Sequence, residues 1–157
     1  LAYIGAPTPD NIQGVNWMPT LSNGAAPPRD AAFAQYTPDM KRDNLSRAVI
    51  TDRYHLIRYF DQGRAVDYPV DVHPQAFADH VLRCPTKGTR PFAQLFDLEA
   101  DPYELHDIAA DPEQQARVAA LSARLLAWMK AADDPLLEAP LRTPYYKRAI
   151  VDLKRET

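Results

Sequence analysis

The stretch LFDLEADPYELHDIAADPEQQARVAALSARLLAWM, Leu95 to Met129, largely determines the fold predicted for this chain of 157 residues. It reads as a short strand, a turn, one helical turn and a long helix. Asp-Pro pairs begin two capping patterns, so we expect Asp101 to start the short helical turn and Asp111 the long helix. After Asp111, apolar residues recur at helical spacing and predict one buried stripe: Val118, Leu121, Leu125, Trp128 and Met129.

Four short segments outside the long helix have the composition of β-strands. Asp52-Arg53 separates two of them and predicts a two-residue hairpin turn. In the second of that pair, the alternation places Leu56, Arg58 and Phe60 on one face. The predicted fold class is therefore α+β, a small antiparallel sheet of about four strands packed by the long helix. The expected strands are Ala32–Tyr36, Arg47–Thr51, Tyr54–Phe60 and Leu95–Leu98.

Composition and charge place limits on the partners. The chain has a formal net charge of −3, 46% hydrophobic and 25% charged residues, as an ordinary globular domain has. We expect no nucleic-acid partner, because no basic run interleaved with aromatic residues occurs. We also expect no membrane span, because no apolar run is long enough. Cys84 is the single cysteine and is more simply a small, partly buried thiol than a nucleophile.

The two ends of the chain differ from its middle. Leu1–Gly5 reads as the last turn of a helix with a Gly stop, which suggests that the chain is a fragment or one piece of a longer polypeptide. Ala6–Asp30 is dense in Pro and Gly and predicts turns, with one short helical turn within Val15–Leu21. After Thr143-Pro144 the alternatives are a frayed tail and a packed helix, of which we favour the helix.

No familiar catalytic or metal-binding motif is present. His73 and His80 are seven residues apart, roughly 10 Å on a continuous helix, which is too far for one ion to bind both. The paired acids near Asp97 and Asp101 fit turns and caps better than general acid–base catalysis. No G-x-S-x-G pattern and no Gly-rich phosphate loop occur. We expect structural or surface roles for the four histidines: His55, His73, His80 and His106.

The same central stretch carries a family resemblance. LFDLEADPYELHDIAADPEQ, preceded by AVITDRYHLIRYF at Ala48–Phe60, resembles the C-terminal subdomain of the type I, formylglycine-dependent sulfatases. Within that family the sequence is most similar to the N-sulfoglucosamine sulfohydrolases (sulfamidases). Each motif is weak alone, but their order and spacing from about Ile4 to Pro140 are fairly specific. Further supporting residues are Tyr68-Pro69-Val70-Asp71, Trp128, Asp134-Pro135 and Ala139-Pro140.

The resemblance implies a domain organisation. Residues 1–30 would be a linker and the edge of a catalytic α/β domain of alkaline-phosphatase-like fold that precedes this chain. Residues 31–135 would form the sulfatase C-terminal α+β subdomain, and residues 136–157 a C-terminal tail, for which the favoured alternative is a helix. The partner would be the catalytic domain, in the same or a separate chain. A periplasmic, secreted or lysosomal location is implied by the family alone.

The resemblance also implies where the chemistry lies. Formylglycine and calcium would be held in the catalytic domain, and we expect this chain to bind neither. Cys84-Pro85-Thr86-Lys87 departs from the family's C/S-x-P-x-R motif, because Pro follows immediately and the Arg is lacking. No catalytic or metal-binding residue is therefore carried over to this chain. We expect the complete enzyme to hydrolyse a sulfate ester or N-sulfate group of a sulfated sugar, and this chain alone to be inactive.

Four residues are the candidates for contact with the sugar: Arg53, Arg58, Asp71 and His73. An Arg can hold a sulfate or carboxylate through two hydrogen bonds, and Asp or His can accept from sugar hydroxyls. The alternative, favoured by about two to one, is that both Arg residues pair with nearby acids and Asp71 caps a helix over Pro74–Arg83. Asp61–Pro91 is the long insertion in which we expect binding residues. The alternative function is a non-catalytic carbohydrate-binding or protein-interaction module.

Overall fold

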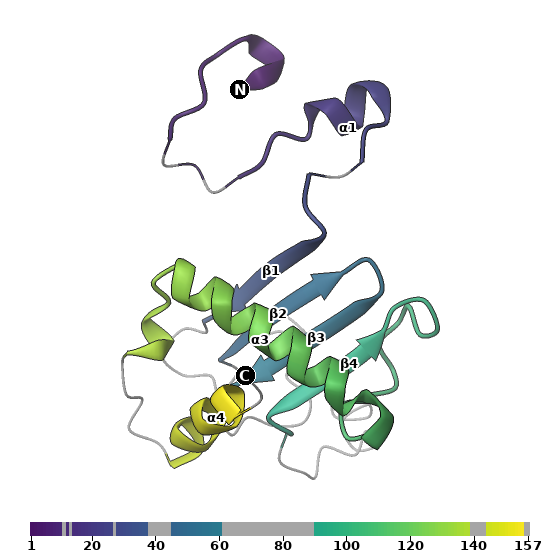
Figure 1. Cartoon of the computed structure of the whole chain (residues 1–157), viewed down its shortest axis with the longest axis vertical. Helices are drawn as coiled ribbons and strands as arrows, with labels where there is room; N and C mark the ends of the chain where they lie inside the picture. The colour runs from purple at the N-terminus through teal and green to yellow at the C-terminus, as the bar shows by residue number, and fades with distance from the viewer. Residues whose placement is uncertain are drawn as a thin grey trace, which may run out of the picture. The chain divides into compact units, whose positions relative to one another are not determined.

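The computed structural model describes residues 1–10, 12, 14–26, 28–37, 45–60, 90–138 and 144–155 (Figure 1). The chain divides into two compact units, Leu1–Ala32 and Phe33–Thr157. The helix predicted over Pro74–Arg83 lies outside the described residues, as does most of the 61–91 insertion.

The first unit consists of turns and one short helix. Ala2–Ile4 is a single 3-10 turn that ends at Gly5, whose φ of 68° is the left-handed conformation that a Gly stop requires. The predicted helical turn is present as α1, Met18–Asn23, slightly later than expected. Gly24, with φ 70°, ends α1 by donating its backbone N–H to the carbonyl of Thr20 at 3.1 Å. These elements enclose an apolar hollow of about 370 Å³ beside Tyr3, Trp17 and Leu21.

The second unit is built on a four-stranded sheet in the order β1-β2-β3-β4. The β2–β3 and β3–β4 pairs are antiparallel, and α3 lies across one face (Figure 1). This arrangement confirms the α+β fold predicted from the sequence. The strands are β1 (Ala31–Tyr36), β2 (Ser46–Thr51), β3 (Tyr54–Tyr59) and β4 (Ala93–Asp97), and the helices are α3 (Gln115–Ala131) and α4 (Pro144–Arg155).

The predicted hairpin turn is confirmed by the strand register. Ile50 of β2 pairs with His55 of β3, which leaves Asp52 and Arg53 as the turn. The Thr51 hydroxyl fixes this turn, because it accepts from the Tyr54 N–H at 2.9 Å and donates to the Tyr54 carbonyl at 3.1 Å. The sequence therefore brings Arg53 to the tip of a rigid hairpin.

The core lies between the sheet and the two helices. Leu56 of β3 and Leu95 of β4 are fully buried, as are Leu125 of α3 and Leu153 of α4. The predicted stripe of α3 is buried except at Trp128, which is partly exposed and stacks on Phe33 with ring centroids 5.1 Å apart. Removing this apolar surface from water is the main force that holds the helices on the sheet.

The capping prediction is correct at Asp111 and wrong at Asp101. The Asp111 carboxylate accepts from the Glu113 N–H at 2.9 Å and begins a 3-10 turn that leads into α3. At Asp101 the chain forms a turn rather than a helical turn, and Glu104 has a φ of 55°. Glu104 does not reach back to Asp101, because its carboxylate lies 2.8 Å from Nδ1 of His55 on β3. The Asp101 carboxylate accepts from the His106 N–H at 2.7 Å, while a residue distant in sequence holds the Glu104 carboxylate.

The predicted helix after Thr143-Pro144 is α4, which begins at Pro144 and ends at Arg155. Ala149 and Leu153 are buried on the side expected from their spacing. The tail therefore packs, and the alternative of a frayed end does not apply to these residues.

Candidate functional site

The four residues predicted to contact a sugar are not brought together as one described site. Arg53 lies in the turn before β3, and Arg58 lies near the end of that strand, about 16 Å further along at the usual rise of an extended chain. Asp71 and His73 lie outside the described residues. Arg53 and Arg58 therefore have separate surroundings.

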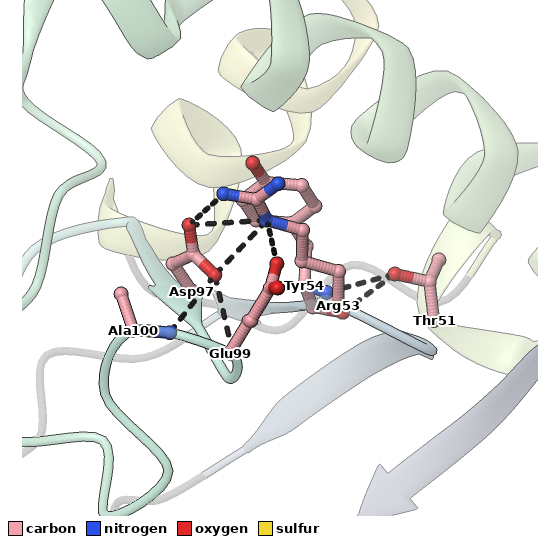
Figure 2. Close-up of polar contacts among 6 residues, drawn as sticks. All are labelled: Thr51, Arg53, Tyr54, Asp97, Glu99 and Ala100. Atoms are coloured by element: carbon pink, nitrogen blue, oxygen red, sulfur yellow. Dashed lines mark hydrogen bonds and ion pairs between the residues drawn. The ribbon is translucent and has the colours of Figure 1, made fainter.

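Arg53 forms a cluster with two carboxylates, Asp97 and Glu99, where the β2–β3 turn lies beside the end of β4 (Figure 2). Its Nη2 donates to Oδ2 of Asp97 at 2.9 Å, and its Nε lies 3.2 Å from both Asp97 oxygens. Nε is also 3.3 Å from Oε2 of Glu99. The Arg53 side chain remains 50% exposed, so solvent or a ligand can reach this guanidinium without unfolding the turn.

Charge and hydrogen bonding in this cluster favour the ionised forms. The hydrogen bond to Asp97 raises the pKa of Arg53 above its ordinary value, against a smaller opposing effect of desolvation. The pKa of Asp97 is lowered, chiefly by the Arg53 hydrogen bond and further by the backbone N–H groups of Ala100 and Glu99. Both groups are therefore charged at neutral pH, and neither Arg53 nor Asp97 is a neutral acid that could donate a proton.

The aromatic ring of Tyr54 lies beside the cluster. The Arg53 guanidinium carbon lies 5.2 Å from the centroid of the Tyr54 ring, and that of Arg117 lies 4.0 Å from it. Cations near an aromatic face are stabilised by the ring quadrupole. Arg117 is partly covered, and α3 contributes a second guanidinium group beside Tyr54.

The cluster also connects the hairpin to the turn after β4. The Leu98 N–H donates to the Arg53 carbonyl at 2.7 Å, and the Asp97 carboxylate accepts from the N–H groups of Glu99 and Ala100. These bonds fix the backbone of Arg53 and the position of the Asp97 carboxylate. Chemically, the arrangement can bind an anion at the exposed edge of a guanidinium, but it contains no nucleophile.

Arg58 is buried between the sheet and both helices. It is 2% exposed, and its Nη2 donates to Oδ2 of Asp152 in α4 at 2.6 Å. Its Nη1 donates to the Ser122 hydroxyl of α3 at 3.3 Å. Both Arg candidates thus pair with acids, as the alternative interpretation of the sequence predicted. Contact with a sugar stays a prediction for Arg53, Arg58, Asp71 and His73.

The most deeply buried ion pair among the described residues was not predicted from the sequence. Arg47 of β2 donates Nε to Oδ2 of Asp134 at 2.6 Å and Nη2 to Oδ1 at 3.1 Å, and both side chains are almost fully buried. Burial alone would raise the pKa of Asp134, but the Arg47 hydrogen bond and the Leu136 N–H together hold it below its ordinary value. Asp134 and Arg47 are 87 residues apart in the sequence, so no local pattern indicates that they pair.

The described residues contain no group of three His, Cys, Asp or Glu side chains that could hold a metal ion. Among the helices of the described part of the chain, none is long and apolar enough to cross a membrane.

Comparison with known proteins connects this fold with sulfatases. No family model matches the chain. Two proteins of Formosa agariphila, each an "ulvan-active sulfatase", match it in sequence. One is 25% identical over 148 residues, which cover 89% of this chain and 29% of the relative. The other is 26% identical over 147 residues, which cover 85% of this chain and 24% of the relative.

Solved structures have the same fold over a similar length. A protein in complex with its substrate D-glucosamine-2-N,6-O-disulfate matches with a TM-score of 0.59 and 21% identity, over 85% of this chain and 23% of the other. A 2-O GAG sulfatase matches with a TM-score of 0.60 and 16% identity, over 87% and 24%.

The chain therefore has the fold of the C-terminal subdomain of sulfatases, and its sequence is similar to part of two sulfatases. It spans about a quarter of the length of the relatives it matches. The likeness to sulfatases predicted from the motifs is confirmed at this level.

Proposed function

We propose that this chain is the C-terminal portion of a sulfatase that hydrolyses sulfate ester or N-sulfate groups of a sulfated sugar. The observation that carries the proposal is the sequence match to an ulvan-active sulfatase over 89% of this chain but 29% of that relative. The substrate of one structural neighbour, D-glucosamine-2-N,6-O-disulfate, carries both kinds of sulfate group. The motif likeness to the sulfamidases leads us to propose an N-sulfated sugar first and a sulfate ester second.

The catalytic groups would lie upstream of this chain. Formylglycine and calcium are implied by the family, but the described residues offer no set of ligands that fits a metal ion. Cys84 lies outside the described residues, and its sequence context lacks the Arg of the family motif. We therefore assign this chain no chemical step and propose that it is inactive alone.

The role proposed for this chain is to support one side of the substrate. Arg53 is held at a rigid turn with half of its side chain exposed, so it can exchange part of its contact with Glu99 for a sulfate or carboxylate. The Glu99 side chain is itself 72% exposed and free to move aside at little cost, because exposed ion pairs are weak. Asp71 and His73 keep their proposed role as acceptors for sugar hydroxyls.

The alternative is an independent carbohydrate-binding or protein-interaction module. The second unit has its own core and would support that alternative. The first unit does not support it, because large apolar side chains such as Tyr3, Ile4 and Leu21 are mostly exposed there. Such surface normally contacts another part of the protein or a partner, so a longer polypeptide is the better explanation.

The first test is the intact mass of the natural gene product. A species several times heavier than 17.7 kDa supports the proposal, and a species of 17.7 kDa contradicts it. The second test compares the 157-residue chain with the longer product in assays that release sulfate. N-sulfoglucosamine and glucosamine 6-sulfate are the paired substrates. We expect turnover by the longer product alone, and faster release from the N-sulfated sugar; turnover by the short chain would refute its assigned inactivity.

A further inference from the structure

Helix α4 presents a basic face to solvent. Lys147, Arg148, Val151, Lys154 and Arg155 are all exposed. At 3.6 residues per turn these five positions fall within an arc of about 120°. The opposite side of α4 carries Ala149 and Leu153, which are buried against the rest of the unit. The helix is therefore amphipathic with a cationic outer side.

The rotation of α4 about its axis is fixed by its contacts. Leu153 is fully buried, and Asp152 accepts from Arg58 of β3 at 2.6 Å. Asp152 is the single acid between Pro144 and Arg155, and this ion pair holds its carboxylate at Arg58. The basic face thus gains no acid from its own helix.

Three of the four cations have no ion pair within the part of the chain that the structure describes. These are Lys147, Arg148 and Arg155; Lys154 does have a partner. Like charges on adjacent turns repel one another, so this face is destabilising unless solvent ions or a ligand neutralise it. The concentration is also local, because the whole chain carries a net charge of −3.

The helix dipole explains half of this face. Lys154 and Arg155 lie in the last turn, where cations interact favourably with the free carbonyl groups. Lys147 and Arg148 lie near the start of α4, where the dipole gives a cation no benefit. A role in helix stability therefore does not account for the complete face.

We propose that the basic face of α4 binds a polyanionic polysaccharide through sulfate and carboxylate groups along the sugar chain. Arg148 and Arg155 are separated by about 10 Å along the helix, roughly the length of two pyranose rings, so that they can contact successive anionic groups. Each guanidinium group can bind sulfate or carboxylate through two hydrogen bonds.

This inference rests on the proposed function, which identifies the bound polysaccharide as the polymer that carries the sulfate groups. It places a contact for the substrate on a helix to which no chemical step is assigned. Such a contact raises the local concentration of the polymer and lowers KM for long chains. The effect should be absent for a monosaccharide, which is too short to contact cations about 10 Å apart along α4.

An anionic membrane is the competing occupant, and the structure disfavours it. An amphipathic helix binds a membrane by inserting its apolar face into the headgroup region. In α4 that face is used inside the protein, where Ala149 and Leu153 are buried. Among the α4 side chains that the structure describes, residues 147–155, Val151 is the one exposed apolar residue, which is too little for insertion. A soluble polyanion needs only the charges.

The test measures binding of a fluorescent heparin oligosaccharide to the 157-residue chain at several salt concentrations. The test variant is K147Q/R148Q, which removes the two cations that the helix dipole does not explain. The matched control, R29Q/K130Q, removes two exposed cations outside α4. We expect K147Q/R148Q to weaken binding by about tenfold or more and to reduce the slope of log affinity against log salt by about two. The control should bind like the wild type.

Three results would overturn the proposal. They are no heparin binding by the wild type, equal losses in the two variants, and binding to vesicles containing phosphatidylserine that matches or exceeds heparin binding. An uncharged chitin oligosaccharide should bind neither to the wild type nor to the variants. Circular dichroism of K147Q/R148Q verifies that α4 is still folded. If the longer product proves to lack sulfatase activity but heparin binding depends on Lys147 and Arg148, the inference stands and the proposed function fails.

Discussion

Arg47 and Arg53 stand at opposite ends of the β2–β3 hairpin and make the same kind of bond in opposite surroundings. Each guanidinium holds an aspartate through two of its nitrogen atoms. The Arg47 side chain is 3% exposed and its partner Asp134 2%, whereas Arg53 is 50% exposed and its partner Asp97 17%. Water therefore competes for the charges of the Arg53–Asp97 pair but hardly reaches those of the Arg47–Asp134 pair.

This difference separates a structural pair from an exchangeable one. Water cannot replace either partner of Arg47, which joins β2 to the chain that follows α3 and also donates to the carbonyl of Ser46 at 2.8 Å. Around Arg53, water and a bound anion can both take the place of a carboxylate at small cost. A guanidinium is useful for ligand binding where its present partner can be displaced, and Arg53 meets that condition.

The largest effect should follow from breaking the buried pair. We expect Asp134→Ala to lower the free energy of unfolding by about 3–5 kcal/mol, because it leaves the Arg47 charge buried without its partner. It also removes the acceptor for the Leu136 N–H. Urea denaturation followed by circular dichroism measures the change.

A double variant is the control for this prediction. Arg47→Met combined with Asp134→Leu should lose less stability than the sum of the two single changes, because neither charge is then left unpaired. Additive losses would show that the pair contributes no coupling, and the contrast between Arg47 and Arg53 would fail.

A smaller effect should appear as the buried pair is titrated. The pKa of Asp134 is lower in the folded chain than in the unfolded chain, where it is about 4. Its stabilising contribution is therefore complete above pH 4 and is lost as pH falls through the lower, folded value. We expect the stability difference between wild type and Asp134→Asn to shrink over that acidic range in pH-dependent urea unfolding. A difference that is constant from neutral to strongly acidic pH would contradict this interpretation.

The smallest effect on stability should come from the exposed pair. Arg53→Gln should change the urea midpoint much less than Asp134→Ala, since exposed ion pairs contribute little and the backbone bonds of the turn remain. In the longer product, the same variant should raise KM for a sulfated sugar while leaving the melting temperature nearly unchanged. Asp52→Asn, in the same turn, is the matched control. A loss of stability as large as that of Asp134→Ala would assign Arg53 to the structure alone.

The local elements of the fold were predictable because their causes are local. Asp52-Arg53 gave the hairpin, Asp111-Pro112 gave the start of α3, and the apolar spacing gave its buried side. Asp101 was misread because the same local grammar was present, but His55, from a distant strand, holds the Glu104 carboxylate instead. Propensity fails where a tertiary contact offers a side chain a better partner.

The residue types of the candidate site could be predicted from the sequence, but the partners of each side chain could not. The sequence suggested that Arg53 and Arg58 could bind anions, and it also allowed both to pair with acids. Which acids they meet depends on the packing of β4 and α4 against β3, since Asp97 is 44 residues from Arg53 and Asp152 is 94 residues from Arg58. The basic face of α4 could have been found by marking its cations on a helical wheel.

The sequence by itself determined the strands, the helices, the hairpin and the likeness to sulfatases, because these depend on spacing and on neighbouring residues. The tertiary structure decided which charges are buried, which stay open to solvent and which side of α4 faces outward. The physical reason is that burial and partner choice are properties of surfaces brought together from distant parts of the chain. The sequence around an arginine does not show whether its guanidinium group is buried in the core or exposed to solvent.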